Sequence, residues 1–268
     1  MTLPDPQAII ERFVAACEAD DRIMAAFLGG SRARDRADEF SDVDLCVITR
    51  DDAFDDVVRD RPSLIEALGE PVFVEDFGHA EVVSFVLADG TEAEIFFGRE
   101  GALGDLWPGR HRTLFDRSGI LEGVRFEEER SDLAENEDAL RQSLSWFWHE
   151  LSHFVKAIGR NQLWWAAGQL EALRNHCVNI VRIEQGVLAG DEPYWKLDDE
   201  VRTAAIEPLE ATFVPMERDA LLAAGHILVS FFRERAPRVA AAHRLIYPAD
   251  LATVMVKRLD DLPSGIDL

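Results

Sequence analysis

Residues 28–48 read LGGSRARDRADEFSDVDLCVI, and this stretch guides the interpretation of the whole sequence. An apolar run from Ile23 to Leu28 stops at two glycines and a serine, and a second apolar run extends from Val43 to Ile48. Short apolar runs bounded by turn residues are typical of buried strands. The pattern therefore predicts two strands, with a glycine-serine bend at the end of the first and a polar stretch before the second.

Two aspartates lie where the second strand begins. Because side chains alternate between the faces of a strand, Asp42 and Asp44 are expected to point the same way, and Val43 and Leu45 into the core. Carboxylates side by side repel each other unless a cation neutralises them. Hard oxygen ligands suit Mg²⁺, which takes its remaining ligands from water and substrate phosphates. The pair therefore predicts a magnesium site.

The bend before the polar stretch is suited to a phosphate. Gly29 and Gly30 let the backbone approach a phosphate closely, and Ser31 supplies an N–H and a hydroxyl to its oxygens. Arg32 and Arg34 can add positive charge to the same site. We therefore expect the triphosphate of a nucleotide to bind here.

A third carboxylate is expected from a hairpin. Residues 81–98 read EVVSFVLADGTEAEIFFG, in which two β-rich runs flank an Asp-Gly pair, a strong hairpin signal. Glu94 is flanked by apolar residues and lies deeper in its run than Glu92. An acid in an apolar strand is costly unless it has a partner or a function. We expect Glu94 to complete a two-metal site, as a metal ligand or as the general base for an acceptor hydroxyl.

The sequence changes character near residue 125. Before it, helical and strand signals are mixed; after it, long helical patterns predominate. We predict an α+β protein, with a small mixed-sheet domain over residues 1–124 and an all-α helical bundle over residues 125–268. Helices are expected at 131–159, 162–187, 199–207, 216–235 and 248–258, with breaks at Gly159, residues 190–193, Pro208 and Pro237.

The composition excludes several classes of partner. A formal net charge of −23 argues against nucleic acid, because phosphate backbones are bound by surplus Lys and Arg. The negative field would attract a cationic acceptor and divalent metal, or it reflects a salt-adapted or high-GC source, which the three lysines also fit. The apolar runs are too short to span a bilayer, and residues 1–20 do not resemble a secretory signal. We expect no membrane contact and a cytoplasmic location.

A second motif points to different chemistry. Residues 149–153 read HELSH, an HExxH string on a predicted helix, in which two imidazoles one turn apart can bind zinc while the Glu activates water. A zinc protease is therefore an alternative function. Lys156 stands where an extended protease motif would have Gly, and no third ligand is evident.

The same helix suggests a role for its polar face. His149, His153, Lys156 and Arg160 share one face, which is either a solvated surface or the wall of a cleft. In a cleft, Lys156 and Arg160 would bind triphosphate oxygens and neutralise the leaving pyrophosphate. Glu171 is a candidate to bind an acceptor ammonium or to orient the acceptor hydroxyl.

Two tryptophans follow on the next predicted helix. Trp164 and Trp165 are either core residues or, at Trp165 above all, a stacking surface for a base or sugar.

The segment GGSRARDRADEFSDVDL, with GSRA and DEFSDVD as its most telling parts, resembles the signature of the polymerase-β nucleotidyltransferase superfamily. It is most similar to antibiotic-modifying members, the streptomycin-type aminoglycoside adenylyltransferases and the lincosamide nucleotidyltransferases. The resemblance implies Ser31 at the triphosphate, Asp42 and Asp44 on magnesium, and Glu94 at the position of a catalytic acid. It also implies that a helical domain closes over the acceptor. Glu94 departs from the Asp that is common in the superfamily, which leaves its role open.

Together these observations and the resemblance predict an adenylyltransferase that uses two Mg²⁺ ions to move AMP from ATP to a hydroxyl of a small acceptor, such as a cationic aminoglycoside or a lincosamide antibiotic. The alternative closest in chemistry is a protein-modifying adenylyltransferase of the toxin–antitoxin type. A nucleotide-binding protein without turnover is a further alternative, against which the intact acids argue.

Overall fold

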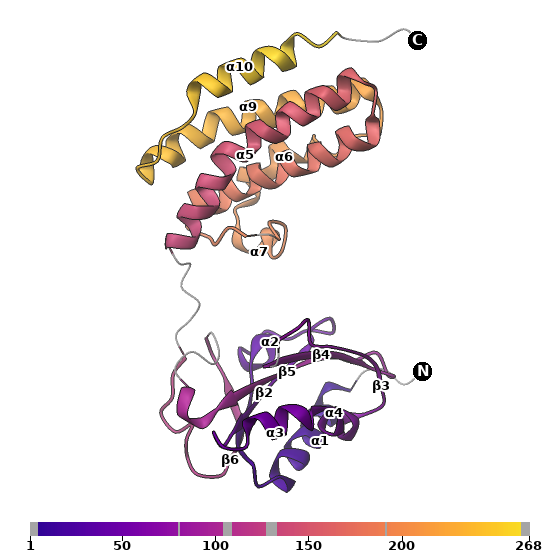
Figure 1. Cartoon of the computed structure of the whole chain (residues 1–268), viewed down its shortest axis with the longest axis vertical. Helices are drawn as coiled ribbons and strands as arrows, with labels where there is room; N and C mark the ends of the chain where they lie inside the picture. The colour runs from indigo at the N-terminus through magenta and orange to yellow at the C-terminus, as the bar shows by residue number, and fades with distance from the viewer. Residues whose placement is uncertain (1–4, 80, 104–108, 127–132, 191, 264–268) are drawn as a thin grey trace. The chain divides into compact units, whose positions relative to one another are not determined.

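The computed structural model describes residues 5–79, 81–103, 109–126, 133–190 and 192–263. The chain divides into two compact units, Met1–Arg130 and Ser131–Leu268 (Figure 1). The first contains a mixed six-stranded sheet with helices, and the second contains helices. This arrangement confirms the predicted α+β class.

The sheet of the first unit has the strand order β3-β4-β5-β2-β1-β6. Its strands are β1 (Ile23–Leu28), β2 (Val43–Thr49), β3 (Pro71–Glu75), β4 (Val82–Leu87), β5 (Glu92–Arg99) and β6 (Arg112–Asp116). β2 and β5 are parallel, and the other neighbouring pairs are antiparallel. The predicted hairpin is confirmed as β4 and β5. Gly90 in its turn has a positive φ of 88°, which favours glycine.

The first unit also contains helices within its described residues. They are α1 (Pro6–Ala19), α2 (Gly30–Ala33), α3 (Phe54–Arg59) and α4 (Arg61–Leu68), followed after β5 by a short 3₁₀ helix, η1 (Glu100–Ala102). The Asp5 carboxylate accepts a hydrogen bond from the Ala8 N–H and so caps α1. α1, α3 and α4 lie on the same side of the sheet (Figure 1), and their apolar side chains join one core with the inward residues of β2, β4 and β5.

Strand β2 separates two environments. Val43, Leu45 and Val47 are buried in the core under these helices. Cys46 and Ile48 point to the opposite face, where they pack in a smaller core with residues such as Leu121 and Phe126. Asp42 and Asp44 have the same parity as Cys46, so they belong to this second face.

In the described residues of the second unit, four long helices are accompanied by two short ones. They are α5 (Leu133–Gly159), α6 (Leu163–Glu184), α7 (Leu197–Glu200), α8 (Thr203–Glu210), α9 (Arg218–Ala242) and α10 (Ala249–Asp260). In the core, the rings of Phe147 and Phe232 stack with centroids 3.8 Å apart. Gly225 permits a close approach of α9 to α5, since a Cβ there would lie 2.4 Å from a ring carbon of Phe154.

Two predicted helix breaks in this unit are wrong. Pro208 lies inside α8, and Pro237 lies inside α9, which continues to Ala242. A proline removes one helical hydrogen bond, but Ala236 and Val239 on either side of Pro237 are buried in the core. Burial on both sides offsets the lost bond, so tertiary packing overrides the local signal. The helix expected at 199–207 is instead divided between α7 and α8.

In the part of the chain that the structure describes, none of the helices combines the length and apolar character needed to cross a bilayer.

Candidate active site

Two acids are brought together by the pairing of β2 with β5. The parallel register places Asp44 beside Glu94, and the antiparallel pairing of β4 with β5 places Ser84 on the other side of Glu94. Paired residues of neighbouring strands share a face, so all three side chains lie on the face opposite α1, α3 and α4. The Ser84 hydroxyl donates a hydrogen bond of 2.6 Å to Glu94 Oε1, which fixes one oxygen of that carboxylate.

Asp44 is the electrostatic centre of this group. Its pKa is raised to about 6, first by burial and then by the negative charges of Asp42 and Glu94, while Arg34 opposes the shift. Asp42 itself is exposed, immediately before β2. Three like charges within reach of one another are therefore only partly compensated, and a cation at this face would favour the ionised form of Asp44.

The three carboxylates are less tightly gathered than the ligands of a single ion. Among the described residues, a group of three possible ligands whose atoms all lie within 4.8 Å of one another occurs at His149, Glu150 and His153, not at the sheet acids.

The glycine-serine bend packs directly against Asp44. The Gly29 N–H donates a hydrogen bond of 3.0 Å to the Asp44 carbonyl oxygen. Gly30 has a φ of +54°, and a Cβ at this position would lie 1.6 Å from Asp44 Oδ2. Glycine is thus required at position 30 both by its backbone conformation and by the carboxylate that occupies the neighbouring space.

Ser31 contributes a buried hydroxyl to the bend. Its Oγ has no hydrogen-bond partner within the described residues, and a buried polar atom without a partner is costly. Other buried atoms such as Trp148 Nε1 share this condition, so it is the position beside the acids that distinguishes Ser31. A phosphate oxygen is a suitable partner for this hydroxyl.

Arg32, which we expected at the phosphate, has backbone partners. Its Nε donates to the Asp42 carbonyl oxygen and its Nη2 to that of Ser41, both at 2.8 Å. The guanidinium therefore ties the two ends of the polar loop together just ahead of the acids. Phe40, within this loop, is 87% exposed.

Sequence reasoning missed a cationic pocket at the same end of the sheet. β6 pairs with β1 so that Arg112 lies beside Leu28, which brings the residues before β6 next to the bend. The ring of His111 lies 5.2 Å from that of Phe27, which belongs to the face of Cys46 and Asp44. The pocket has a volume of about 440 Å³ and is lined by Gly109, Arg110, His111, Val124, Arg125 and Phe126. No local motif marks these residues; only the strand pairing reveals them.

The remaining predicted site residues belong to the second unit. Lys156 on α5 and Arg160 just after it are exposed, and Trp165 on α6 is half-buried, with its ring 5.7 Å from that of His153. The carboxylate of Glu171 forms an ion pair with Arg174 one turn further along α6. Glu171 is therefore already partly neutralised within its own unit.

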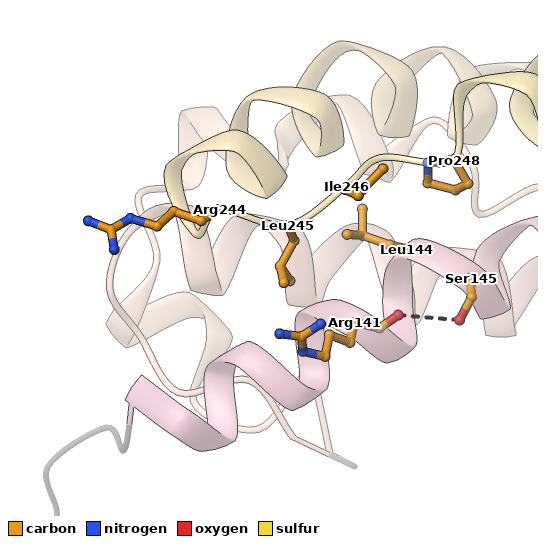
Figure 2. Close-up of a pocket in the computed structure, with 7 residues that line it drawn as sticks. All are labelled: Arg141, Leu144, Ser145, Arg244, Leu245, Ile246 and Pro248. Atoms are coloured by element: carbon orange, nitrogen blue, oxygen red, sulfur yellow. Dashed lines mark hydrogen bonds between the residues drawn. The ribbon is translucent and has the colours of Figure 1, made fainter.

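A pocket of about 420 Å³ opens in the second unit between α5 and the segment that joins α9 to α10 (Figure 2). Leu144, Leu245 and Ile246 give it an apolar surface, and Arg141 and Arg244 stand at its edge. In Figure 2 the Arg244 side chain points away from the other residues that line the pocket.

Comparison with known proteins identifies a family that matches most of the chain. The family described as streptomycin adenylyltransferase matches residues 5–262. An aminoglycoside 6-adenyltransferase from Bacillus subtilis is 15% identical, with 96% of this chain and 98% of that chain covered and a TM-score of 0.44. A nucleotidyltransferase-like protein from Exiguobacterium sibiricum 255-15 is 17% identical, with 97% and 81% covered and a TM-score of 0.40. No curated protein matches this chain.

Proposed function

Because the chain belongs to the streptomycin adenylyltransferase family, we propose that it transfers AMP from ATP to a hydroxyl of a small acceptor. The observation that carries this proposal is the arrangement of Asp44 and Glu94 on neighbouring parallel strands, with Asp42 within electrostatic reach and the Gly30–Ser31 bend against Asp44. We propose the first unit as the nucleotidyltransferase domain and the second as the acceptor-binding domain.

The chemistry of the acids fits magnesium. Asp42, Asp44 and Glu94 offer hard carboxylate oxygens. The pKa of Asp44 is raised by burial first and by the neighbouring negative charges second, and a bound cation would offset both effects. These three residues would hold two Mg²⁺ ions, which when bound offset the charge of the triphosphate and of the departing pyrophosphate. Ser31 would donate its buried hydroxyl to a triphosphate oxygen, which satisfies an otherwise unpartnered group.

The donor has a second candidate contact surface in the cationic pocket. His111 and Phe126 present aromatic rings 4.9 Å apart, and Arg110 and Arg125 add guanidinium groups. Aromatic and guanidinium surfaces both stack on nucleobases, so we assign this pocket to the base of the donor. We retain Lys156 and Arg160 as proposed ligands of the triphosphate, since both are exposed cations.

Catalysis would rest on positioning and on one proton transfer. The acceptor hydroxyl attacks the α-phosphorus in line, a P–O bond forms, the bond to pyrophosphate breaks, and the hydroxyl proton is taken up by a base. Glu94 is the proposed base or third metal ligand. Ser84 occupies its Oε1, which leaves Oε2 for that role.

A cationic acceptor is supported by charge. The formal net charge of −23 favours positively charged ligands, which aminoglycosides are and most other small alcohols are not. Glu171 and Trp165 are the proposed acceptor contacts. Because Arg174 already pairs with Glu171, an acceptor ammonium would have to share that carboxylate or displace the guanidinium.

The test is a pyrophosphate-release assay with ATP and Mg²⁺ across a panel of aminoglycosides and lincosamides. We expect release with one acceptor class and none with Asp44→Asn, while mass spectrometry finds AMP on the small molecule. AMP on a polypeptide would instead support the protein-modifying alternative. Equal turnover by the Asp44→Asn variant would refute the metal assignment.

A further inference from the structure

We propose that His149, Glu150 and His153 on α5 form a binding site for a divalent transition-metal ion such as Zn²⁺, separate from the magnesium site. One ligand atom from each of these residues lies within 4.8 Å of the others. The rings of His149 and His153 have centroids 4.4 Å apart, and His153 Nδ1 lies 3.7 Å from Glu150 Oε2. Small side-chain rotations suffice to bring three atoms at these separations to the bond lengths of about 2.0–2.2 Å that zinc requires.

Helix geometry explains why the site can form on one element. Residues four apart lie one above the other on a helix face, so the two imidazoles adjoin without help from another segment. α5 is long, and its opposite face is buried through Phe147, Leu151 and Phe154, which fixes the direction of the polar face. The two imidazole ligands, His149 and His153, are therefore held on a rigid helix.

The surroundings of the ligands favour a bound cation. The Glu150 side chain is only 17% exposed, so its negative charge is poorly solvated and gains from a counter-ion. The rings of Trp146 and Trp165 flank the histidines at 5.0 and 5.7 Å and restrict their rotamers. His149 is exposed, which leaves a path for the ion and room for water to complete four-fold coordination.

The ligand set selects the ion. Imidazole nitrogen suits zinc, copper, nickel and cobalt, whereas Mg²⁺ requires oxygen ligands in an octahedral arrangement. The two proposed sites would therefore not compete for the same metal. The assignment also differs from the protease reading of HELSH, because Glu150 serves here as the third ligand rather than as a base beside a third ligand from elsewhere. Within the described residues, the cluster consists of these three side chains.

The experiment uses full-length protein without a histidine tag, stripped with EDTA and kept in millimolar Mg²⁺. Zn²⁺ is titrated by calorimetry, and Co²⁺ is added in parallel so that its visible absorption reports coordination. We expect one Zn²⁺ per chain at this site. His149→Ala and His153→Ala should each weaken binding at least tenfold, Glu150→Gln should weaken it several-fold, and all three should lower the cobalt absorption.

His226→Ala is the matched control. His226 Nδ1 lies 3.6 Å from Asp260 Oδ1, a comparable histidine-carboxylate pair without a second imidazole, so this variant should bind zinc like the wild type. Circular dichroism verifies that each variant keeps its helices. The proposal is overturned if His153→Ala keeps wild-type affinity, if His226→Ala loses as much, or if Mg²⁺ at millimolar concentration displaces the ion. None of these readouts depends on adenylyl transfer, so this site can fail while the proposed function stands.

Discussion

Asp44→Asn should stabilise the metal-free protein while it abolishes activity. The folded protein holds the pKa of Asp44 at about 6, above the ordinary 3.8, through burial and the charges of Asp42 and Glu94. A group whose pKa is raised by folding binds protons more readily in the folded state, so its ionisation destabilises the fold. The cost is absent below pH 3.8, grows as the pH rises through the range 3.8–6, and is complete above it.

The size of the effect follows from the same shift. The difference between about 6 and 3.8 corresponds to at most about 3 kcal/mol at neutral pH, and solvent around the half-buried side chain reduces this to about 1–2 kcal/mol. Asparagine has nearly the same shape and no charge, so the variant should gain that amount at pH 7.5. At pH 4.5 the carboxyl is protonated in the folded protein but largely ionised in the unfolded chain, so the gain of the variant should be clearly smaller than at pH 7.5 and should vanish below pH 3.8.

Hydrogen exchange of the buried β2 amides reports the stability of the first unit separately from that of the second. The measurement is made in EDTA so that no metal ion is bound. We expect protection to rise about 5- to 30-fold in the variant at pH 7.5, the equivalent of about 1–2 kcal/mol. Glu92→Gln, which removes an exposed acid from β5, is the control and should leave protection unchanged. Mg²⁺ with a non-hydrolysable ATP analogue should protect the wild type and not the variant. The reasoning would be refuted if Asp44→Asn were no better protected than the wild type at pH 7.5. It would also be refuted if the gain in protection over the wild type were the same at pH 4.5 as at pH 7.5.

Three further substitutions test other parts of the structure. Gly30→Ala should lower the free energy of unfolding by at least about 1–2 kcal/mol in urea titrations and eliminate pyrophosphate release. The reason is that the new Cβ would overlap the Asp44 carboxylate and that alanine disfavours the positive φ at this position. Full activity of the variant would contradict this. Ser84→Ala should reduce kcat about tenfold with little change in KM, because the Glu94 carboxylate loses the hydrogen bond that positions it; an unchanged kcat would contradict the role proposed for Glu94. Arg182→Met should lower the free energy of unfolding by about 3 kcal/mol in a urea titration, since this buried guanidinium donates hydrogen bonds to three carbonyl oxygens and to Glu200. A loss below about 1 kcal/mol would show that water replaces the guanidinium as the partner of those oxygens.

The local sequence pattern predicts those features of the candidate site that depend on one strand or one turn. Strand alternation puts Asp42 and Asp44 on one face, and the Asp-Gly turn identifies the hairpin that carries Glu94. The parallel pairing that sets Glu94 beside Asp44 is different, because it joins segments 50 residues apart whose register no local signal specifies. The sequence therefore names the acids without showing that they are neighbours.

Other positions have surroundings that local pattern does not reveal, because their partners come from elsewhere in the fold. Arg32 reads as a phosphate ligand, yet backbone carbonyl oxygens take up its N–H groups. His111 carries no motif and gains its position from the pairing of β6 with β1. Pro237 reads as a helix end, yet burial on both sides of it carries α9 onward.

The loop closed by Arg32 offers a place for a spectroscopic probe. One guanidinium fastens its far end, so changes between residues 34 and 40 need not disturb the acids that follow. The chain's three cysteines, Cys17, Cys46 and Cys177, are all buried. A Phe40→Cys substitution would thus introduce a solvent-accessible thiol that labels selectively while every native cysteine is kept. A fluorophore attached there would report directly on ligands that enter beside the bend.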